Sequence, residues 1–177
     1  DMIKLLKTEK NSGVSAATNM GYRHSVGQYI ALLGDDDYWE DPQKTAKQFE
    51  LMENNLHLGV TGSWWVEMRN NGVKFEKKPI LPMREYMIKE RLLKGGGIVC
   101  GSTQLISRVA WDDVGGMDEK QLRGTDSDLV RRIAFSGYEI AVISEITTVV
   151  DCAHIGSRMT PAHNDRSTIS HLYANLR

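Results

Sequence analysis

The sequence predicts an α/β fold whose sheet begins with parallel strands and gains antiparallel strands later. Short apolar runs alternate with helical patterns over residues 2–54, which is typical of strand–helix–strand units. Two β-rich segments then flank Asn71-Gly72, the dipeptide of a tight hairpin turn. The chain has 177 residues, of which 41% are hydrophobic and 25% charged. This length and composition suit one globular domain that buries its own core.

Each expected element rests on a local pattern. Apolar runs bounded by polar residues or glycine indicate strands, and periodic segments behind a capping residue indicate helices. Asp41 suits an N-cap, and Pro42 suits the first helical position after it. "QYIALL" is of the kind found in a buried parallel strand. In order, we expect a strand at 2–8, a helix at 15–25, a strand at 28–33, a helix at 42–54, strands at 57–68 and 72–78, a helix at 83–93, a strand at 102–108, a short helix with a turn at 109–119, a helix at 126–136, strands at 138–143 and 147–153, and a helix at 167–176.

Charge and cysteine usage narrow the class of function. The formal net charge is −1 and the sequence pI is about 6.6, which gives no support to a nucleic-acid partner. Cys100 and Cys152 match no metal or redox spacing, so we expect buried free thiols, with a disulfide left open. No apolar run approaches the roughly 20 residues of a membrane span, and no signal peptide is recognised. A cytoplasmic location is therefore expected.

Three aspartates, Asp35, Asp36 and Asp37, follow the apolar run directly. Carboxylates about 4 Å apart repel by roughly 4 kcal/mol at an effective dielectric near 20, so such a triplet needs wide solvation or a cation. In α/β sheets ligands bind at the carboxyl ends of strands, where this triplet is expected. Mg²⁺ and Mn²⁺ take one or two carboxylates together with phosphate oxygens. A solvated acidic loop and a metal–nucleotide site both remain open, whereas an EF-hand does not fit.

Three further segments carry a functional and a plain structural interpretation. In "NSGVSAATNMG", Gly13 and the helix start could bring backbone N–H groups to a phosphate, or the small residues could simply pack a helix closely on the sheet. Asp126, at a helix start after a glycine-containing loop, is placed to act as a base or as an N-cap. Asp128 and Arg132 have the spacing of an i, i+4 surface pair. His154 follows a strand, where a lone histidine is more often structural.

Taken together and in this order, "NSGVSAATNMG", "GQYIALLGDDDYW", "VGGMDEKQLRGTDSDLVRRIAFSGYEI" and "DCAHIGS" resemble the motifs of the family 2 glycosyltransferases, which have the glycosyltransferase A fold. The resemblance runs from Ile3 to Ser157. It implies a Rossmann-like mixed sheet flanked by helices, with 1–157 as a partial catalytic domain and 158–177 as a C-terminal helical tail. Family members begin with an additional strand, helix and strand, so the resemblance implies an N-terminal truncation of roughly 60 to 70 residues.

The resemblance also implies roles for individual residues. Asp37 takes the place of the direct metal ligand, and Asp126 that of the catalytic base. Gly34 stands where the family often has its first aspartate, while Thr18 and Thr125 replace the usual arginine and glutamate. The implied metal site comprises Asp37, Asp36 and His154, and the implied substrate-binding residues are Asn11, Gly13, Asn19, Asp35, Asp36 and Arg132.

The implied reaction is the transfer of a sugar from a nucleotide-diphosphate sugar to an acceptor hydroxyl, with inversion and with Mg²⁺ or Mn²⁺ as cofactor. The acceptor would be a carbohydrate or a lipid-linked molecule, with no nucleic acid as partner. Peripheral membrane association and a homodimer are left open. Two other classes also stay open, a nucleotidyltransferase and a non-catalytic or inert fragment of a glycosyltransferase.

Overall fold

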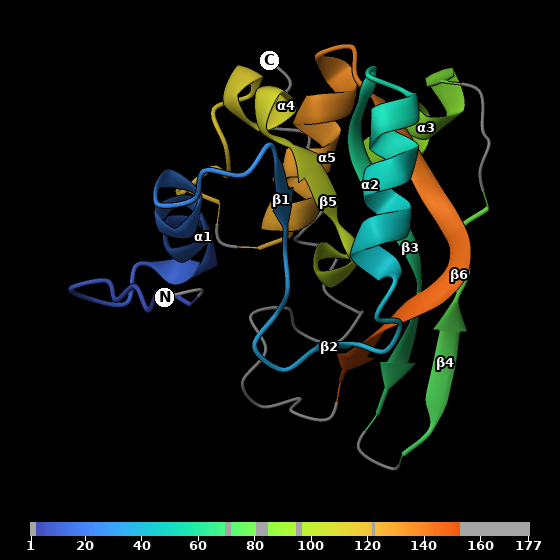
Figure 1. The fold of residues 1–177 in the computed structure, drawn as a ribbon, viewed down its shortest axis with the longest axis horizontal. Helices are drawn as coiled ribbons and strands as arrows, with labels where there is room; N and C mark the ends of the chain where they lie inside the picture. The colour runs from blue at the N-terminus through green and yellow to red at the C-terminus, as the bar shows by residue number, and fades with distance from the viewer. Residues whose placement is uncertain (1–2, 70–71, 81–84, 95–96, 122, 153–177) are drawn as a thin grey trace.

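The fold is a mixed α/β structure. The computed structural model describes residues 3–69, 72–80, 85–94, 97–121 and 123–152 (Figure 1). Its elements are α1 (Gly13–Arg23), β1 (Tyr29–Ala31), β2 (Tyr38–Trp39), α2 (Lys44–Asn54), β3 (Leu58–Met68), β4 (Lys74–Lys77), α3 (Glu85–Leu93), the 3₁₀ turn η1 (Gly101–Thr103), β5 (Leu105–Ser107), α4 (Arg108–Asp113), α5 (Thr125–Phe135) and β6 (Glu139–Asp151). No described helix is long and apolar enough to cross a membrane.

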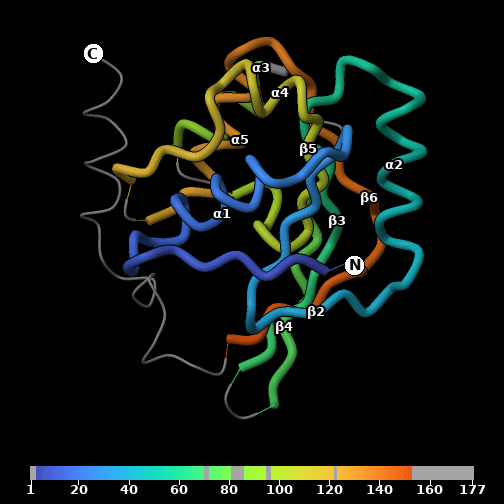
Figure 2. The backbone as a smooth tube through the Cα atoms, turned by 60° about the vertical axis from the view of Figure 1, so that its left-hand side comes forward, coloured from blue at the N-terminus to red at the C-terminus, as the bar shows by residue number. Residues whose placement is uncertain are grey.

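The sheet is built around two long strands, β3 and β6, which run parallel to each other. The strand order is β1-β5-β3-β6-β2, and β4 pairs with β3 as a hairpin. Helix α2 covers one face, whereas α3, α4 and α5 lie on the other (Figures 1 and 2). Alternate residues of the strands therefore face two cores. The larger lies under α4 and α5 and the smaller lies under α2.

Two glycines of β3 let neighbouring segments approach the strand closely. A Cβ atom on Gly62 would lie 2.2 Å from Val99 Cγ1, and one on Gly59 would lie 2.5 Å from Ile133 Cγ2. Neither position has room for a methyl group. Because Val99 immediately precedes Cys100 and η1, the contact at Gly62 places η1 directly against the middle of the sheet.

The structure corrects three strand predictions. Residues 3–8 form no strand, and the side chains of Ile3 and Leu5 are 89% and 91% exposed. The apolar run at 28–33 is not a buried parallel strand, because β1 pairs antiparallel with β5 at the sheet edge and is only partly buried. An apolar run does not reveal which strand will lie beside it. The two strands expected at 138–143 and 147–153 are the single strand β6, which bends through irregular pairing with β3.

Helix and hairpin predictions are largely confirmed, with shifts at the ends. Helix α2 begins at Lys44 rather than Pro42, because the Asp41 side chain accepts a hydrogen bond from Gln43 N (2.8 Å) and its carbonyl accepts one from Lys44 N (3.1 Å). Gly72 has a positive φ of 73°, as a tight turn requires. The helix expected at 167–176 lies outside the described residues.

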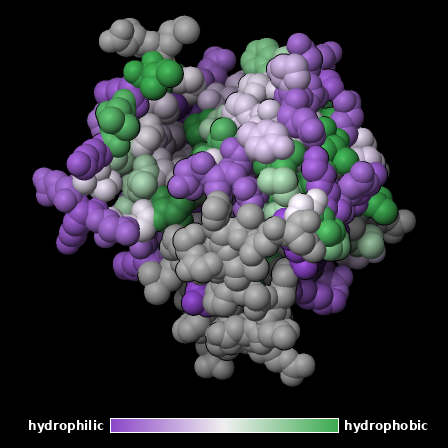
Figure 3. Space-filling view, turned by 90° about the horizontal axis from the view of Figure 1, so that it is seen from below, coloured by the Kyte–Doolittle hydropathy of each residue, from purple (hydrophilic) through white to green (hydrophobic). Residues whose placement is uncertain are grey.

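Both cysteines are free, as expected; Cys152 is buried and Cys100 is half-buried. On the face of the molecule seen from below, exposed apolar side chains are interspersed with polar ones (Figure 3).

Candidate functional site

The predicted metal ligand and the predicted base lie against the same short turn, η1. Ser102 Oγ donates a hydrogen bond to Asp37 Oδ2 and accepts one from Gly34 N at 2.8 Å. On the preceding residue, a Cβ atom added to Gly101 would lie 3.3 Å from Asp126 Oδ2. Ser102 therefore contacts one carboxylate, and the open space beside Gly101 borders the other, although the two aspartates lie far apart in the sequence.

The pKa of Cys100, the residue before η1, also shows that Asp37 and Asp126 lie close to this turn. Burial raises the pKa of the Cys100 thiol to about 12. The negative charges of Asp126, Asp37 and Glu67 add to this upward shift of the pKa, in decreasing order. A thiolate is disfavoured here because its negative charge would lie near three carboxylates in a partly desolvated environment. A bound cation would offset this concentration of negative charge.

Asp37 is held on both of its carboxylate oxygens. Its Oδ1 accepts a hydrogen bond from Asp151 N at 3.0 Å, at the end of β6, and its Oδ2 contacts Ser102. Trp39 secures the same region, because its indole Nε1 donates to the Ser102 carbonyl at 2.8 Å. The short pairing of β2 with β6 thus fixes the backbone that directly follows the half-buried Asp37.

Asp36 and Asp37 both approach Gly34, and Asp35 is exposed beside them. A Cβ atom at Gly34 would lie 2.9 Å from Asp37 Oδ2 and 3.2 Å from Asp36 Oδ1. The described residues contain no cluster of three or more His, Cys, Asp or Glu side chains able to hold a metal. Two converging carboxylates nevertheless fit Mg²⁺ or Mn²⁺, which take their remaining ligands from water and phosphate. His154 lies outside the described residues.

Asp126 stands in the first turn of α5, where the backbone enters the helix through Gly124, with a positive φ of 61°. The first turn is anchored by Asp128, whose side chain is only 5% exposed and pairs with both Arg131 and Arg132. The predicted pairing of Asp128 with Arg132 is thus confirmed, but it is not an open surface pair, because Asp128 is buried and Arg132 is only 29% exposed. Arg132 Nε lies 2.8 Å from Asp128 Oδ2.

Arg132, a predicted substrate-binding residue, makes its hydrogen bonds mainly within the protein, to Asp128 and to the backbone of Val114. Its Nη1 donates to the carbonyl of Val114 at 2.8 Å and so ties α5 to the end of α4. Its Nη2 is buried without a hydrogen-bond partner among the described residues. Within the described residues, the arginine therefore keeps one terminal nitrogen without a partner while it holds the helix that carries Asp126.

The predicted contacts on α1 are also engaged with the protein. Asn11 Oδ1 accepts a hydrogen bond from Gly13 N at 3.1 Å, so the amide expected at a phosphate is held by its own turn. Asn19 is buried, and its amide exchanges hydrogen bonds with Met117 N (3.0 Å) and Met117 O (2.9 Å) and donates to Glu119 Oε1 at 3.0 Å.

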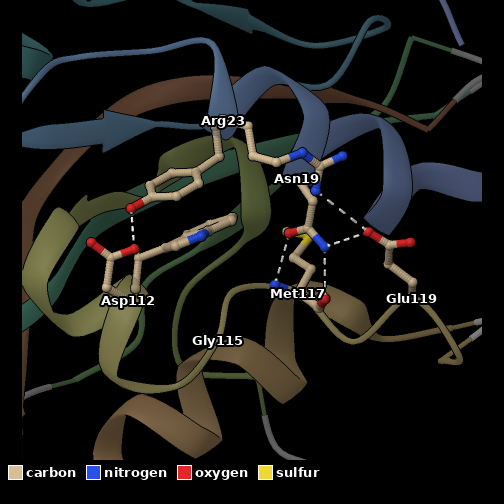
Figure 4. A pocket seen from close by; sticks show the side chains of 8 residues that line it. Asn19, Arg23, Asp112, Gly115, Met117 and Glu119 are labelled. Carbon is tan, nitrogen blue, oxygen red and sulfur yellow. Dashed lines mark hydrogen bonds and ion pairs between the residues drawn. The ribbon is translucent and has the colours of Figure 1, made fainter.

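Asn19 forms one wall of a hollow of about 400 Å³ between α1 and the segment around α4 (Figure 4). The remaining lining residues are Tyr22, Arg23, Trp111, Asp112, Gly115, Met117 and Glu119. Gly116 borders Asn19 closely, since a Cβ there would lie 2.9 Å from Asn19 Oδ1 and its φ is +73°. The second glycine of "VGGMDE" is thus required by the docking of Asn19.

Sequence reasoning missed the residues that join the two carboxylates. Ser102 was expected at the start of the strand at 102–108, and neither Gly101 nor Trp39 was assigned a role in the site. The nearby glycine-rich stretch before Cys100 is typical of a loop, and such a pattern does not indicate which residues it contacts. Contacts across the sheet are not encoded in any short pattern.

Comparisons with known proteins concern the family and the fold of the chain. Residues 1–115 match the model of the family described as glycosyl transferase family 2. The chain is 30% identical over 148 residues to an uncharacterized glycosyltransferase of Methanocaldococcus jannaschii, with 81% of this chain and 48% of the relative covered. It is 25% identical over 143 residues to an uncharacterized glycosyltransferase of Haemophilus influenzae, covering 78% and 48% of the two chains. The chain thus spans about half the length of these relatives.

Two solved structures share the fold. S. aureus TarS 1–349 in complex with UDP-GlcNAc has a TM-score of 0.72 at 13% identity, covering 96% of this chain and 47% of that TarS chain. The mannosyltransferase PcManGT from Pyrobaculum calidifontis, in complex with GDP-Man and Mn²⁺, has a TM-score of 0.59 at 17% identity, covering 88% and 40%. These likenesses confirm the expected glycosyltransferase A architecture. With a family match over residues 1–115 and this fold, the chain belongs to glycosyl transferase family 2.

Proposed function

We propose that this chain contributes the metal ligands and the catalytic base of a glycosyltransferase. The enzyme would move a sugar from a nucleotide-diphosphate sugar to an acceptor hydroxyl with inversion. The observation that carries the proposal is the joint contact of Asp37 and Asp126 with η1, through Ser102 and Gly101. The donors printed for the two structural neighbours, UDP-GlcNAc and GDP-Man, support the substrate class.

Asp37, together with Asp36, is the proposed holder of Mg²⁺ or Mn²⁺. Such an ion supplies Lewis-acid stabilisation of the negative charge that builds on a diphosphate leaving group. Asp37 is prepared for this role because Asp151 N and Ser102 Oγ fix its carboxylate before any ligand arrives. The presence of Mn²⁺ in the PcManGT complex supports a divalent ion. His154 is proposed as a further ligand.

Asp126 is the proposed general base. The acceptor oxygen attacks the anomeric carbon, the bond to the diphosphate oxygen breaks with its electron pair on the leaving group, and the acceptor proton passes to Asp126. Gly101 has no side chain to block the space beside this carboxylate. A positioned base of this kind contributes about 10²- to 10⁴-fold to the rate.

The remaining predicted contacts take part in the proposal with separate roles. Asn11 and Asp35 are exposed at the start of α1 and in the acidic turn, where a donor could reach them. Asn19, Gly13 and Arg132 are proposed to shape the site mainly by holding α1 and α5 in place. The carbohydrate or lipid-linked acceptor, the cytoplasmic location and the assignment of 1–157 as the catalytic part remain predictions.

The test combines binding with turnover. Calorimetry should show heat with UDP or GDP that depends on Mn²⁺, and Asp37→Asn should abolish it. Asp126→Asn should reduce sugar transfer at least 100-fold while nucleotide affinity stays within about threefold, because the base acts only in the chemical step. Equal loss of binding and transfer in Asp126→Asn would contradict its role.

Two outcomes would favour the other classes. Release of pyrophosphate in place of a nucleoside diphosphate would identify a nucleotidyltransferase. No metal-dependent heat with either nucleotide would indicate an inert fragment.

A further inference from the structure

Lys44, the first residue of α2, is buried inside the fold. Its side chain is only 1% exposed, and burial lowers its pKa to about 8. Within the described part of the chain no carboxylate pairs with it; its Nζ donates to Gln48 Oε1 at 2.7 Å and lies 4.4 Å above the ring of Trp39. Burying an ammonium group without a counter-charge costs several kcal/mol, so a hydrophobic residue would be more favourable here unless the lysine has a task.

One contact of Lys44 fixes the orientation of Gln48. An ammonium group can only donate, so the Gln48 oxygen must face Lys44 and its NH₂ group must point the other way. That NH₂ group donates to the carbonyl of Thr61 on β3 at 3.1 Å and to the carbonyl of Thr103 at 2.8 Å. Thr103 is the last residue of η1. Gln48 is fully buried, so a reversed amide would leave several groups unsatisfied.

The other contact of Lys44 fixes Trp39. The ammonium lies over the face of the indole, which is the favourable position for a cation–π interaction. In this orientation the indole Nε1 donates to the carbonyl of Ser102 at 2.8 Å. Lys44 therefore reaches two successive carbonyls of η1, that of Ser102 through Trp39 and that of Thr103 through Gln48.

We propose that Lys44 is a positioning residue of this site, which holds η1 through Trp39 and Gln48 and so keeps Ser102 against Asp37 and Gly101 against Asp126. The consequence for nucleotide binding rests on the function proposed above. Lys44 itself touches neither carboxylate and acts only through these two side chains. This role explains why a lysine occupies a position where burial of an apolar side chain would cost less free energy.

The experiment uses variants of α2. Lys44→Met keeps an unbranched apolar chain but removes the charge and the donor, whereas Lys44→Arg keeps both. Lys47→Met is the matched control, because Lys47 lies on the same helix and its ion pairs within the described residues are with Asp41 and Glu145. Trp39→Phe serves as a second variant should Lys44→Met fail to fold; it keeps an aromatic ring for Lys44 and loses only the hydrogen bond to Ser102.

The first measurement is amide hydrogen exchange at η1 in the chain without ligand. The amides of Thr103 and Gln104 donate to Cys100 O at 3.0 Å and Gly101 O at 3.1 Å, so they report directly on the turn. We expect at least tenfold faster exchange in Lys44→Met and in Trp39→Phe, no change in Lys47→Met, and recovery in Lys44→Arg. Amides of β3 should keep their protection. Unchanged exchange at η1 in both Lys44→Met and Trp39→Phe overturns the proposal.

The second measurement is the affinity for Mn²⁺ with UDP by calorimetry. We expect at least a tenfold loss in Lys44→Met, a change below twofold in Lys47→Met, and recovery in Lys44→Arg. If the wild-type chain binds no Mn²⁺–UDP, the proposed function fails, while hydrogen exchange still decides whether Lys44 holds η1. If η1 loosens in Lys44→Met but affinity is unchanged, the residue is structural only and the inference is overturned.

Discussion

Gly34 offers the sharpest test of the metal side of the site. A Cβ atom at this position would lie 2.9 Å from Asp37 Oδ2, 3.2 Å from Asp36 Oδ1 and 3.3 Å from Ser102 Oγ. Non-bonded heavy atoms prefer separations of about 3.5 Å or more, so Gly34→Ala forces the Asp37 carboxylate to retreat by roughly half an ångström. Such a shift breaks the hydrogen bond from Ser102 to Asp37 or moves the carboxylate away from its neighbour Asp36.

The size of the effect follows from that bond. A hydrogen bond to a charged group is worth about 1.5–3 kcal/mol, which corresponds to roughly 10- to 150-fold in a binding constant. We therefore expect Gly34→Ala to weaken Mn²⁺–UDP binding at least tenfold in calorimetry. Because Ser102 and Asp37 are bonded within the folded chain itself, the melting temperature should also fall by several degrees, at about 2–4 °C per kcal/mol for a chain of this size.

Gly21→Ala is the matched control. Gly21 lies in α1, and a Cβ there would meet no atom within 4 Å. Replacing a helical glycine with alanine stabilises the folded chain by about 0.4–1 kcal/mol and should leave binding unchanged. Wild-type affinity in Gly34→Ala would refute the inferred crowding of carboxylates around Gly34.

Two further predictions concern packing and ionisation near the turn. Gly62→Ala should lower the free energy of unfolding, measured in urea, by about 1–3 kcal/mol, because its methyl group would overlap Val99. Adding Val99→Ala should recover part of this loss. An unchanged unfolding midpoint in Gly62→Ala would contradict the close contact. In a variant with Cys152 replaced by serine, Cys100 should react with iodoacetamide at pH 8 far more slowly than an exposed thiol, because its pKa of about 12 keeps it protonated. Adding Asp126→Asn should speed the reaction, because it removes one of the negative charges that raise this pKa. Reaction of Cys100 at the rate of an exposed thiol would show that the site is not buried as described.

The helices and the hairpin were predictable because their signals are local. Asp41 caps its own turn, Gly72 supplies a positive φ, and Gly124 precedes the helix of Asp126. Each of these features depends on residues within a few positions of one another. Strand pairing is different, since "QYIALL" has the same sequence whether its neighbour is parallel or antiparallel, and the expected parallel strand is an antiparallel edge strand.

The acidic triplet and Asp126 were recognisable as candidates from their own surroundings, but their relation to each other was not. Both lie against η1, which carries no charged residue and whose last two residues were expected to begin a strand. The turn is placed by the absence of a side chain at Gly62 and by hydrogen bonds from Trp39 and Gln48. Such contacts bring together residues from four separate parts of the chain.

By itself, the sequence determined the α/β class, most helices, the acidic strand end and the family resemblance, because these depend on periodicity, capping and short ordered motifs. Only the tertiary structure decided that Asp37 and Asp126 share one turn and that a buried lysine holds that turn from behind. The physical reason is that burial and long-range hydrogen bonds depend on which surfaces meet in space, and a residue such as Lys44 looks like any surface lysine until its neighbours have closed around it.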